Sequence, residues 1–379
     1  MHVVVCTVVH HPADARIYFR QIRALLDAGH RVTYIAPWHE PDAPAVLSTG
    51  FDRDSRGDST GNRDQSPLVT VAIPRAVGRR RLGALRAAKA AMAAHVPGAD
   101  LLLVHDPELL LVLPPKSKRP PTVWDVHEDT AAALTTKAWL PEFLRPVASG
   151  GVLTAEHLAE RRLHLILAEH GYNARFAGEH PVVPNTTYVP DTAAPPSGPR
   201  RVVYVGHISP DRGSAEMVEL GRLLAPHGIT VELVGPADAT ARSEIAGGND
   251  AVRWHGFKPN EEALALASGA LAGLSLLCDE ANFRHSMPTK VIEYMARALP
   301  VITTPLPLAV DLVKNANCGF VVPFNDPQAV AEAVLRLDAD PDLRATMGLR
   351  GYEAAKSSLG WAADAQAFVA QLEDWARHP

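Results

Sequence analysis

The stretch PDTAAPPSGPRRVVYVGHISPDRG, residues 190–213, determines the architecture that we predict for this chain. Residues 190–200 are rich in proline and small side chains, a composition typical of a connector. Residues 202–205 form an apolar run followed directly by Gly206, as expected for a buried strand that enters a loop. A similar apolar run opens the chain at HVVVCTVV, residues 2–9. The sequence therefore predicts two α/β halves joined near residue 190.

Short apolar runs alternate with helical patterns in both halves. Residues 15–30, ARIYFRQIRALLDAGH, carry Ile22, Leu25 and Leu26 at helical spacing and close on Gly29, which predicts an amphipathic helix and its stop. Further strand-like runs are RVTYIAP (31–37), LVTVAI (68–73), DLLLVHD (100–106), PTVWDVHED (121–129), ITVELVG (229–235), VRWHGF (252–257), AGLSLL (272–277) and PVITTP (300–305). This alternation predicts parallel, doubly wound sheets, in which ligands bind at the carboxyl ends of the strands.

Composition limits the classes of function. A chain of 379 residues with 47% hydrophobic and 21% charged residues fits a globular protein of two domains, and its net charge of −5 argues against a nucleic-acid partner. The cysteines Cys6, Cys278 and Cys318 lack metal-like spacing, so we predict buried thiols and no metal site. The first apolar run is too short to span a membrane and lacks a basic flank, so we expect a cytoplasmic protein.

The stretch NFRHSMPTKVIEYMARALPVITTP, residues 282–305, is predicted to bind a nucleotide diphosphate. Pro288 suits a helix start, and the first amides of that helix, over residues 289–291, are expected to be free for an anion. Lys290 adds a cation, and Glu293, one turn further on the same face, suits ribose hydroxyls. The alternative is a surface ion pair between Lys290 and Glu293 on a core helix.

A second phosphate contact is predicted at YVGHISPDRG, residues 204–213. Gly206 allows close approach of the backbone to a ligand, and Arg212 can bind phosphate through two hydrogen bonds, with His207 as a supplement. A glycine after a strand is a weak signal alone. The chain has neither GxGxxG nor a P-loop, which argues against NAD binding and simple NTPase activity.

Polar clusters follow three strands of the first half, at HHPADAR (10–16), HDPE (105–108) and DVHED (125–129). A lone histidine is more often a packing or capping residue, but three clusters at one sheet edge indicate a site. His127, between acidic neighbours, suits binding of a substrate hydroxyl or proton transfer. Residues 75–92 are also unusual, because they combine six basic residues with apolar spacing. They form either a solvated helix face or a contact with an anionic membrane, which would place the protein at the inner face of the membrane.

Together these segments resemble the glycosyltransferases of GT-B fold, in the retaining family 4 group. The motifs that carry the resemblance are HHPADARIYFRQIRALLDAGHRVTYIAP, VHDPELL, DVHED, VVYVGHISPDRG and SMPTKVIEYMARALPVITTP. The resemblance implies two Rossmann-like domains facing a cleft. An acceptor domain would span residues 1–190 and a nucleotide-sugar domain residues 191–358. A C-terminal helix, residues 359–379, would pack back on the first domain.

The resemblance also implies roles for individual residues. Arg212 and Lys290 match residues that neutralise the diphosphate, Glu293 matches the ribose ligand, and His127 matches a histidine near the transferred sugar. Two positions depart from the family pattern: His285 replaces a sugar-binding glutamate, and His207 replaces an arginine. The predicted catalytic residues are His127, Arg212 and Lys290; the donor-binding residues are Gly206, His207, Arg212, Phe257, His285, Pro288, Thr289, Lys290 and Glu293; the acceptor-binding residues are Asp14, Arg16, His105, Asp106 and Glu128.

The resulting prediction is a metal-independent, retaining glycosyltransferase without a cofactor. It would use a UDP- or GDP-type sugar as co-substrate and transfer a hexose-type sugar to a polysaccharide or lipid-linked glycan precursor. The alternatives are glycosylation of a secondary metabolite, a sugar-nucleotide epimerase of the same fold, and a non-catalytic partner subunit.

Overall fold

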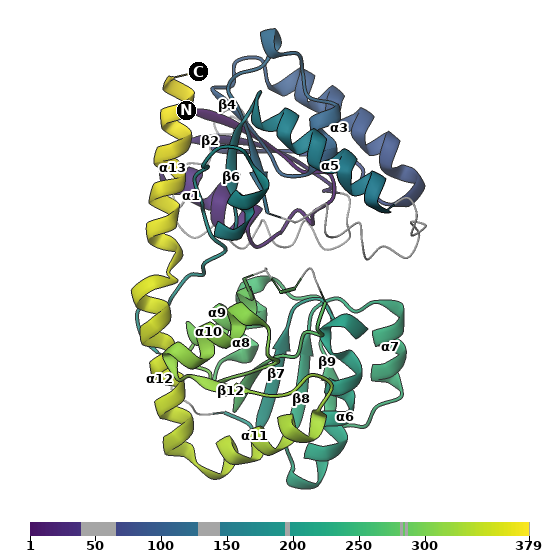
Figure 1. Cartoon of the computed structure of the whole chain (residues 1–379), viewed down its shortest axis with the longest axis vertical. Helices are drawn as coiled ribbons and strands as arrows, with labels where there is room; N and C mark the ends of the chain where they lie inside the picture. Colours follow the sequence, from purple (N-terminus) through teal and green to yellow (C-terminus); the bar gives the residue numbers. More distant parts are fainter. Residues whose placement is uncertain (39–65, 128–144, 194–197, 281–282, 285–286, 379) are drawn as a thin grey trace, which may run out of the picture. The chain divides into compact units, whose positions relative to one another are not determined.

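The computed structural model describes residues 1–38, 66–127, 145–193, 198–280, 283–284 and 287–378. The chain divides into two compact units, Met1–Pro184 with Ala363–Pro379, and Asn185–Ala362. The boundaries predicted from the sequence were at residues 190 and 358. Both units are α/β structures with six-stranded parallel sheets, so the predicted pair of Rossmann-like domains is confirmed (Figure 1).

The sheet of the first unit has the strand order β3-β2-β1-β4-β5-β6. Its strands are β1 (His2–Cys6), β2 (Arg31–Ala36), β3 (Leu68–Ala72), β4 (Leu101–Val104), β5 (Thr122–Val126) and β6 (His164–Leu167). The helices that cover it are α1 (Arg23–Asp27), α3 (Arg81–His95), α5 (Arg145–Glu160) and α13 (Trp361–Arg377). Val4 and Cys6 face a cluster with α3, and Val3 and Val5, on the opposite face, are equally buried. Burial on both faces explains the continuous apolar strands.

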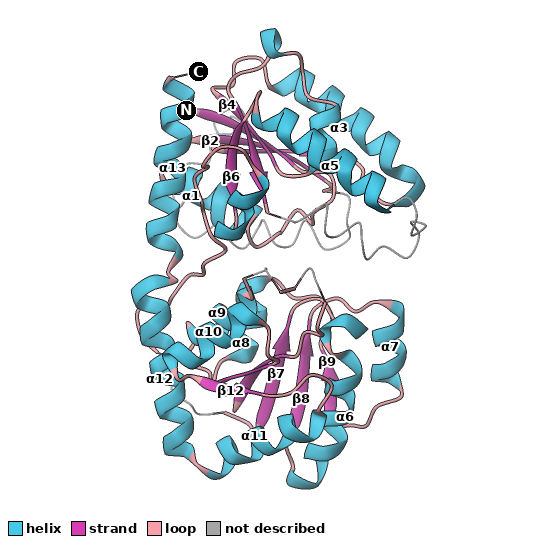
Figure 2. Ribbon diagram, in the orientation of Figure 1, coloured by secondary structure: helices cyan, strands magenta, loops and turns pink. Residues whose placement is uncertain are grey.

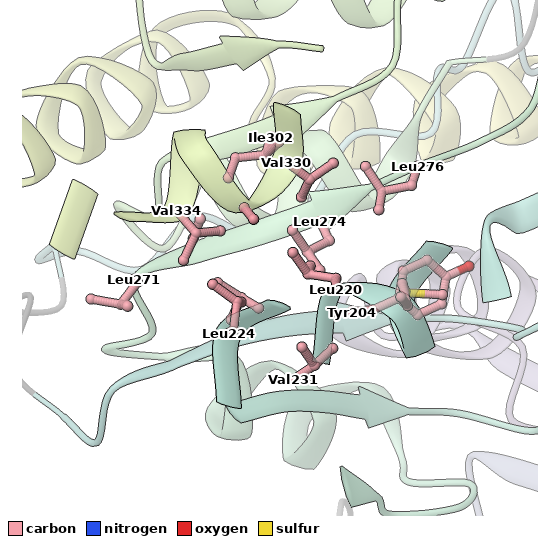
Figure 3. Close-up of a cluster of buried hydrophobic side chains, with 14 of the residues drawn as sticks. Tyr204, Leu220, Leu224, Val231, Leu271, Leu274, Leu276, Ile302, Val330 and Val334 are labelled. Carbon is pink, nitrogen blue, oxygen red and sulfur yellow. The ribbon is translucent and has the colours of Figure 1, made fainter. Parts of the chain in front are cut away.

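The second unit repeats this plan with the order β12-β11-β10-β7-β8-β9. Its strands are β7 (Arg201–Val205), β8 (Thr230–Val234), β9 (Val252–Trp254), β10 (Ala272–Ser275), β11 (Val301–Thr303) and β12 (Gly319–Val321). Its helices are α6 (Ser214–Leu224), α7 (Ala239–Ala246), α8 (Asn260–Ala267), α9 (Thr289–Met295), α10 (Pro307–Ala316), α11 (Pro327–Ala339) and α12 (Pro341–Ser358) (Figure 2). Leu220 and Leu224 of α6 pack with Val330 and Val334 of α11 over one sheet face (Figure 3).

Both sheets therefore have the same doubly wound topology. In each unit the chain reverses its direction of winding between two neighbouring strands, β1 and β4 in the first and β7 and β10 in the second. Ligands of such sheets bind at the carboxyl ends of the strands at this switch point. The segments to inspect are therefore those that directly follow these four strands.

Helix α9 is attached to the switch point of the second unit by Tyr294. The Tyr294 hydroxyl accepts a hydrogen bond from Val205 N at 2.9 Å and lies 3.3 Å from Leu274 O, so it links β7 with β10. Gly273 makes room for the Tyr294 ring, since a Cβ at this position would lie 2.3 Å from ring carbons. Lys290 and Glu293 are therefore held on a helix whose position is determined by packing.

Several local predictions can be compared with the structure. The segment 15–30 forms a π-helical turn over Ile17–Ile22 that continues as α1, and Gly29 ends it with a φ of 79°. The predicted helix over 75–92 was wrong at its start, because α3 begins at Arg81 after a 3₁₀ turn. Cys278 is only half-buried, whereas Cys6 and Cys318 are buried. None of the described helices is long and apolar enough to cross a membrane.

We expect Gly273→Ala to destabilise the second unit by about 1–3 kcal/mol, because a methyl group must displace the buried Tyr294 ring. Urea unfolding followed by fluorescence measures the change. Gly247→Ala is the control in the same unit, since its Cβ would find its nearest neighbours at an ordinary 3.6 Å. Equal stability of both variants would contradict the packing role of Gly273.

Candidate active site

The buried carboxylate of Asp125 organises the switch point of the first unit. Its oxygens accept hydrogen bonds from Arg16 Nε at 2.7 Å and NH2 at 2.6 Å, from Gln21 Nε2 at 3.0 Å and from His105 Nδ1 at 3.1 Å. Burial alone would raise the pKa of Asp125, but the charge and hydrogen bonds of Arg16 hold it well below the usual range. Asp125 is therefore a permanently charged anchor at the end of β5.

Two histidines take their orientation from Asp125. His105 donates from Nδ1 to the Asp125 side chain, which leaves its buried Nε2 without a partner among the described residues. His127 donates from Nδ1 to the main-chain carbonyl of Asp125 at 3.0 Å. Its Nε2 lies 2.9 Å from Nε2 of His10, and burial followed by the charge of His10 lowers the pKa of His127. His127 is thus a neutral imidazole with a defined orientation.

Three of the predicted acceptor-binding residues take part in buried hydrogen bonds. Arg16 is turned inward, where NH1 also donates to Val183 O at 2.9 Å, so its guanidinium supports Asp125. Asp106 is buried and accepts from Thr7 Oγ1 at 2.8 Å and from the backbone of the same loop, and His105 is buried beside Asp125. The hydrogen bonds of these three residues thus connect β5 with the segments after β1 and β4. Asp14 caps the following turn through Arg16 N at 2.8 Å and Ile17 N at 3.0 Å.

The side chains around Asp125 include the types that bind metal ions. Among the described residues, His105, Asp125 and His127 bring three possible ligand atoms within 4.8 Å of one another. However, both histidines direct a protonated Nδ1 toward Asp125, and the guanidinium of Arg16 already neutralises its charge. A cation would have to displace these donors, so the arrangement suits a hydrogen-bonded network better than a metal centre.

In the second unit, Lys290 lies at the switch point as a buried cation. Its Nζ donates to the Tyr204 hydroxyl at 2.9 Å and lies 4.1 Å from the centre of the Tyr204 ring. Burial and then the charge of Arg212 lower the pKa of Lys290 well below the usual range. Gly206 follows β7 with a φ of 134°, and a Cβ there would lie 3.6 Å from Lys290 Nζ. The glycine therefore leaves open space beside the amine.

Arg212 and His207 complete a positively charged group around Lys290. The Arg212 guanidinium lies 5.5 Å from the centre of the Phe283 ring and belongs to the 3₁₀ turn Pro210–Arg212 after β7. Burial and then the charge of Arg212 lower the pKa of His207, which indicates that the two side chains are close. Three groups able to carry positive charge thus converge at this edge, an arrangement that suits a polyanion.

Glu293, at the other end of α9, is buried and accepts a hydrogen bond from Asn260 Nδ2 at 3.1 Å. Glu293 is therefore buried and bonded to Asn260, which differs from the surface ion pair with Lys290 that was the alternative prediction. The predicted free amides of residues 289–291 need correction, because Val291 N donates to Pro288 O at 2.8 Å. The anion-binding potential of this segment thus comes mainly from side chains.

Some predicted residues are placed less directly. Phe257 lies in the loop after β9, and Pro288 is the residue before α9. Glu128 and His285 lie outside the described residues. Sequence reasoning assigned no role to His10, Tyr204 or Asn260. The only signal was their position: His10 lies in the loop after β1, Tyr204 near the end of β7 and Asn260 at the start of α8. Their partners come from distant segments, which local sequence does not reveal.

Comparison with known proteins finds a family match within the second unit. Residues 190–354 match the family model described as "Glycosyl transferases group 1". The capsular polysaccharide biosynthesis glycosyltransferase CapM of Staphylococcus aureus is 28% identical over 168 residues, 41% of this chain and 41% of that protein. The alpha-D-kanosaminyltransferase of Streptomyces kanamyceticus is 30% identical over 173 residues, 43% of each chain. The chain thus matches about two fifths of the length of these relatives.

A solved structure extends the likeness to the whole chain. The HepE protein of Anabaena, in complex with UDP-glucose, aligns with a TM-score of 0.69 at 14% identity, over 99% of this chain and 100% of that chain. At this identity the likeness establishes the fold. The chain therefore has the GT-B fold, and its residues 190–354 match the family model of the glycosyl transferases group 1. The resemblance to this group is confirmed at that level.

We expect Asp125→Asn to lower the free energy of unfolding by about 3–5 kcal/mol, because it removes one charge of a buried ion pair with Arg16. In the wild type this stabilisation is complete at neutral pH, since the folded pKa of Asp125 lies below its unfolded value. It is lost as the pH falls from about 4 toward the folded pKa. Urea unfolding at pH 7 and at acid pH measures both effects.

Asp27→Asn is the matched control, because Asp27 pairs with Arg23 at 3.9 Å on the surface. It should cost less than about 1 kcal/mol. A similarly small cost for Asp125→Asn would contradict its role as the anchor.

Proposed function

We propose that the protein is a retaining glycosyltransferase that moves a hexose-type sugar from a nucleotide-diphosphate sugar to a hydroxyl acceptor. The acceptor class that we favour is a polysaccharide or a lipid-linked glycan precursor, and we expect the reaction to occur in the cytoplasm. The family match of residues 190–354 and the name of the relative from Staphylococcus aureus support this proposal.

One observation carries the proposal above the others. Lys290 is a buried amine that donates to a tyrosine hydroxyl, and burial followed by the charge of Arg212 lowers its pKa. Two cationic groups placed close together in a protein interior repel each other, and burial adds a desolvation cost. A bound diphosphate would remove both penalties. The arrangement is therefore best explained as a site prepared for an anionic ligand.

The residues of the second unit suggest how the donor would bind. Lys290 and Arg212 would contact the diphosphate, with His207 beside them, and Glu293 would accept the ribose hydroxyls, with Asn260 holding its carboxylate. The UDP-glucose complex of the structural relative favours a UDP-type donor over a GDP-type donor. The name of the kanosaminyltransferase indicates that the relatives of this chain differ in the sugar that they transfer.

The reaction follows from these roles. The acceptor hydroxyl forms a bond to the anomeric carbon on the face from which the diphosphate departs, and its proton passes to a phosphate oxygen of the leaving group. Lys290 and Arg212 would stabilise the negative charge that develops on the diphosphate, so we propose that no metal is needed. His127, with its neutral ring, would accept a hydrogen bond from a substrate hydroxyl.

We expect Lys290→Ala to weaken binding of UDP by roughly 10–100-fold, the value of one or more charge-assisted hydrogen bonds. Glu293→Ala should weaken UDP binding to a similar degree and binding of inorganic diphosphate very little, because it removes only the ribose contact. Isothermal calorimetry with UDP, GDP and diphosphate measures these effects, with thermal unfolding as a check that both variants are folded.

The exposed residues Lys314 and Glu332 provide matched controls in the same unit, as Lys314→Ala and Glu332→Ala. Both should bind UDP as the wild type does. Unchanged binding of both nucleotides by the Lys290 and Glu293 variants would exclude the assigned donor site. Conversion of the donor sugar without an acceptor would instead favour an epimerase, and nucleotide binding without any turnover a non-catalytic subunit.

We also propose that the first unit contacts an anionic membrane surface, which would bring a lipid-linked acceptor within reach. Leu82 of α3 is 70% exposed beside basic neighbours, whereas Leu85 and Met92 are buried in the core. A groove of about 470 Å³ in the same unit includes Leu111, which is 79% exposed, and the cations Lys116, Arg119, Arg161 and Arg162. Apolar and basic side chains together are what peripheral membrane binding requires.

The membrane proposal predicts that the protein co-sediments with vesicles containing phosphatidylglycerol and not with pure phosphatidylcholine. The triple change Arg119→Gln, Arg161→Gln and Arg162→Gln should abolish most of this binding, at about 1 kcal/mol per lost charge. The triple change Arg222→Gln, Lys314→Gln and Arg350→Gln removes the same charge from the second unit and should bind as the wild type does. Equal losses in both triple variants would refute a specific surface.

A further inference from the structure

A second histidine reaches His127 from the loop after β1. Nε2 of His10 lies 2.9 Å from Nε2 of His127, and the two ring centres are 4.6 Å apart at an interplanar angle of 57°. The reaction described above uses His127 and assigns nothing to His10. Two imidazoles that face each other through the same kind of nitrogen can form a hydrogen bond only if one nitrogen carries a proton and the other does not.

The other contacts of the two rings decide which nitrogen carries the proton. Nδ1 of His127 lies 3.0 Å from the Asp125 carbonyl, which can only accept, so this Nδ1 is protonated. A neutral His127 then has a lone pair on Nε2. Nε2 of His10 lies 3.2 Å from Oδ1 of Asp106, a carboxylate that can also only accept. The proton between the two rings therefore belongs to His10.

Asp106 is held in position to receive this contact. Its second oxygen accepts hydrogen bonds from Thr7 Oγ1 at 2.8 Å and from the amides of Val8 and Val9 at 2.5 and 3.2 Å. Burial alone would raise the pKa of Asp106, but its hydrogen bond with His10 and the charge of His10 lower it. Asp106, His10 and His127 thus form a chain of contacts that runs from a buried carboxylate to a nearly buried imidazole.

We propose that His10 is a positioning residue that, through its Nε2–H, keeps Nε2 of His127 available as a lone-pair acceptor for a substrate hydroxyl. The hydroxyl takes the place of the His10 N–H when it binds, and His10 then keeps its contact with Asp106. This role rests on the proposed function for its chemistry, but the arrangement of protons does not depend on it.

The surroundings of His127 also predict a pH dependence. Burial first, and then the charge of His10, lower its pKa, whereas the charge of Asp125 raises it. The groups that face the pair are Asp14 and Arg16 from the segment after β1, His105 and Asp106 from the segment after β4, and Asp125 from β5. Since the neutral ring is the active form, kcat/KM should fall on the acid side as His127 becomes protonated.

Two substitutions separate the N–H of His10 from its charge. Glutamine places an amide N–H close to the position of Nε2 but cannot be charged, and leucine provides neither. His10→Gln should keep the tautomer of His127 and a rate close to that of the wild type at alkaline pH, with the acidic limb of kcat/KM moved to higher pH. His10→Leu should move the limb in the same direction and also lower kcat/KM about tenfold at alkaline pH, the value of one hydrogen bond.

Nitrogen NMR of imidazole-labelled full-length protein, without substrate, reads the tautomer and the titration of His127 directly. The wild type and both His10 variants should show a protonated Nδ1 and an unprotonated Nε2, because the Asp125 carbonyl remains in place, and the titration of His127 should move to higher pH in both variants. His157→Gln, on the exposed surface of α5, is the control and should change nothing. An unchanged titration of His127 in His10→Leu would overturn the proposal.

The two readouts distinguish failure of this proposal from failure of the proposed function. The NMR result decides the role of His10 even if the protein transfers no sugar from any nucleotide-sugar donor. If transfer occurs and both His10 variants lose rate without a shift of the acidic limb, His10 is only a structural residue and the proposal is wrong.

Discussion

A charged group buried in a protein requires partners, and the carboxylate of Asp125 shows how much structure that requirement can organise. Arg16 neutralises it, Gln21 and His105 complete its hydrogen bonds, and its own main-chain carbonyl orients His127. These partners come from segments that are distant in the sequence. The need to satisfy one carboxylate therefore brings the loops after β1, β4 and β5 together in a single arrangement.

The second unit solves a related problem with a different device. Tyr294 fills the space left by Gly273 and bonds to the ends of β7 and β10, which holds α9 against the sheet. Lys290 is then buried over the Tyr204 ring, near Arg212. Among the described residues, its hydrogen bond goes to a tyrosine hydroxyl, which is the observation on which the proposed anion site rests.

The sequence predicted much of the fold because parallel strands buried on both faces leave a strong local signal. Strands β1, β2 and β7 were recognised from apolar runs, and the stop at Gly29 from helix-ending chemistry. Prediction failed where packing determines the local structure. The start of α3 at Arg81 was not predicted. The inward orientation of Arg16 was also not predicted, because it results from pairing with Asp125, which lies 109 residues further along the chain. The pattern of charges in the sequence did not distinguish a residue that contacts a ligand from a buried residue that pairs with another side chain.

By itself, the sequence determined that the chain forms two doubly wound α/β units, and it predicted a nucleotide-diphosphate site at Arg212, Lys290 and Glu293. It could do so because strand burial and the spacing of residues on a helix are local properties. Only the tertiary structure decided that Lys290 bonds to Tyr204, that Glu293 bonds to Asn260, and that His10 faces His127. These contacts depend on which strand ends lie side by side, and strand order is a property of the whole sheet.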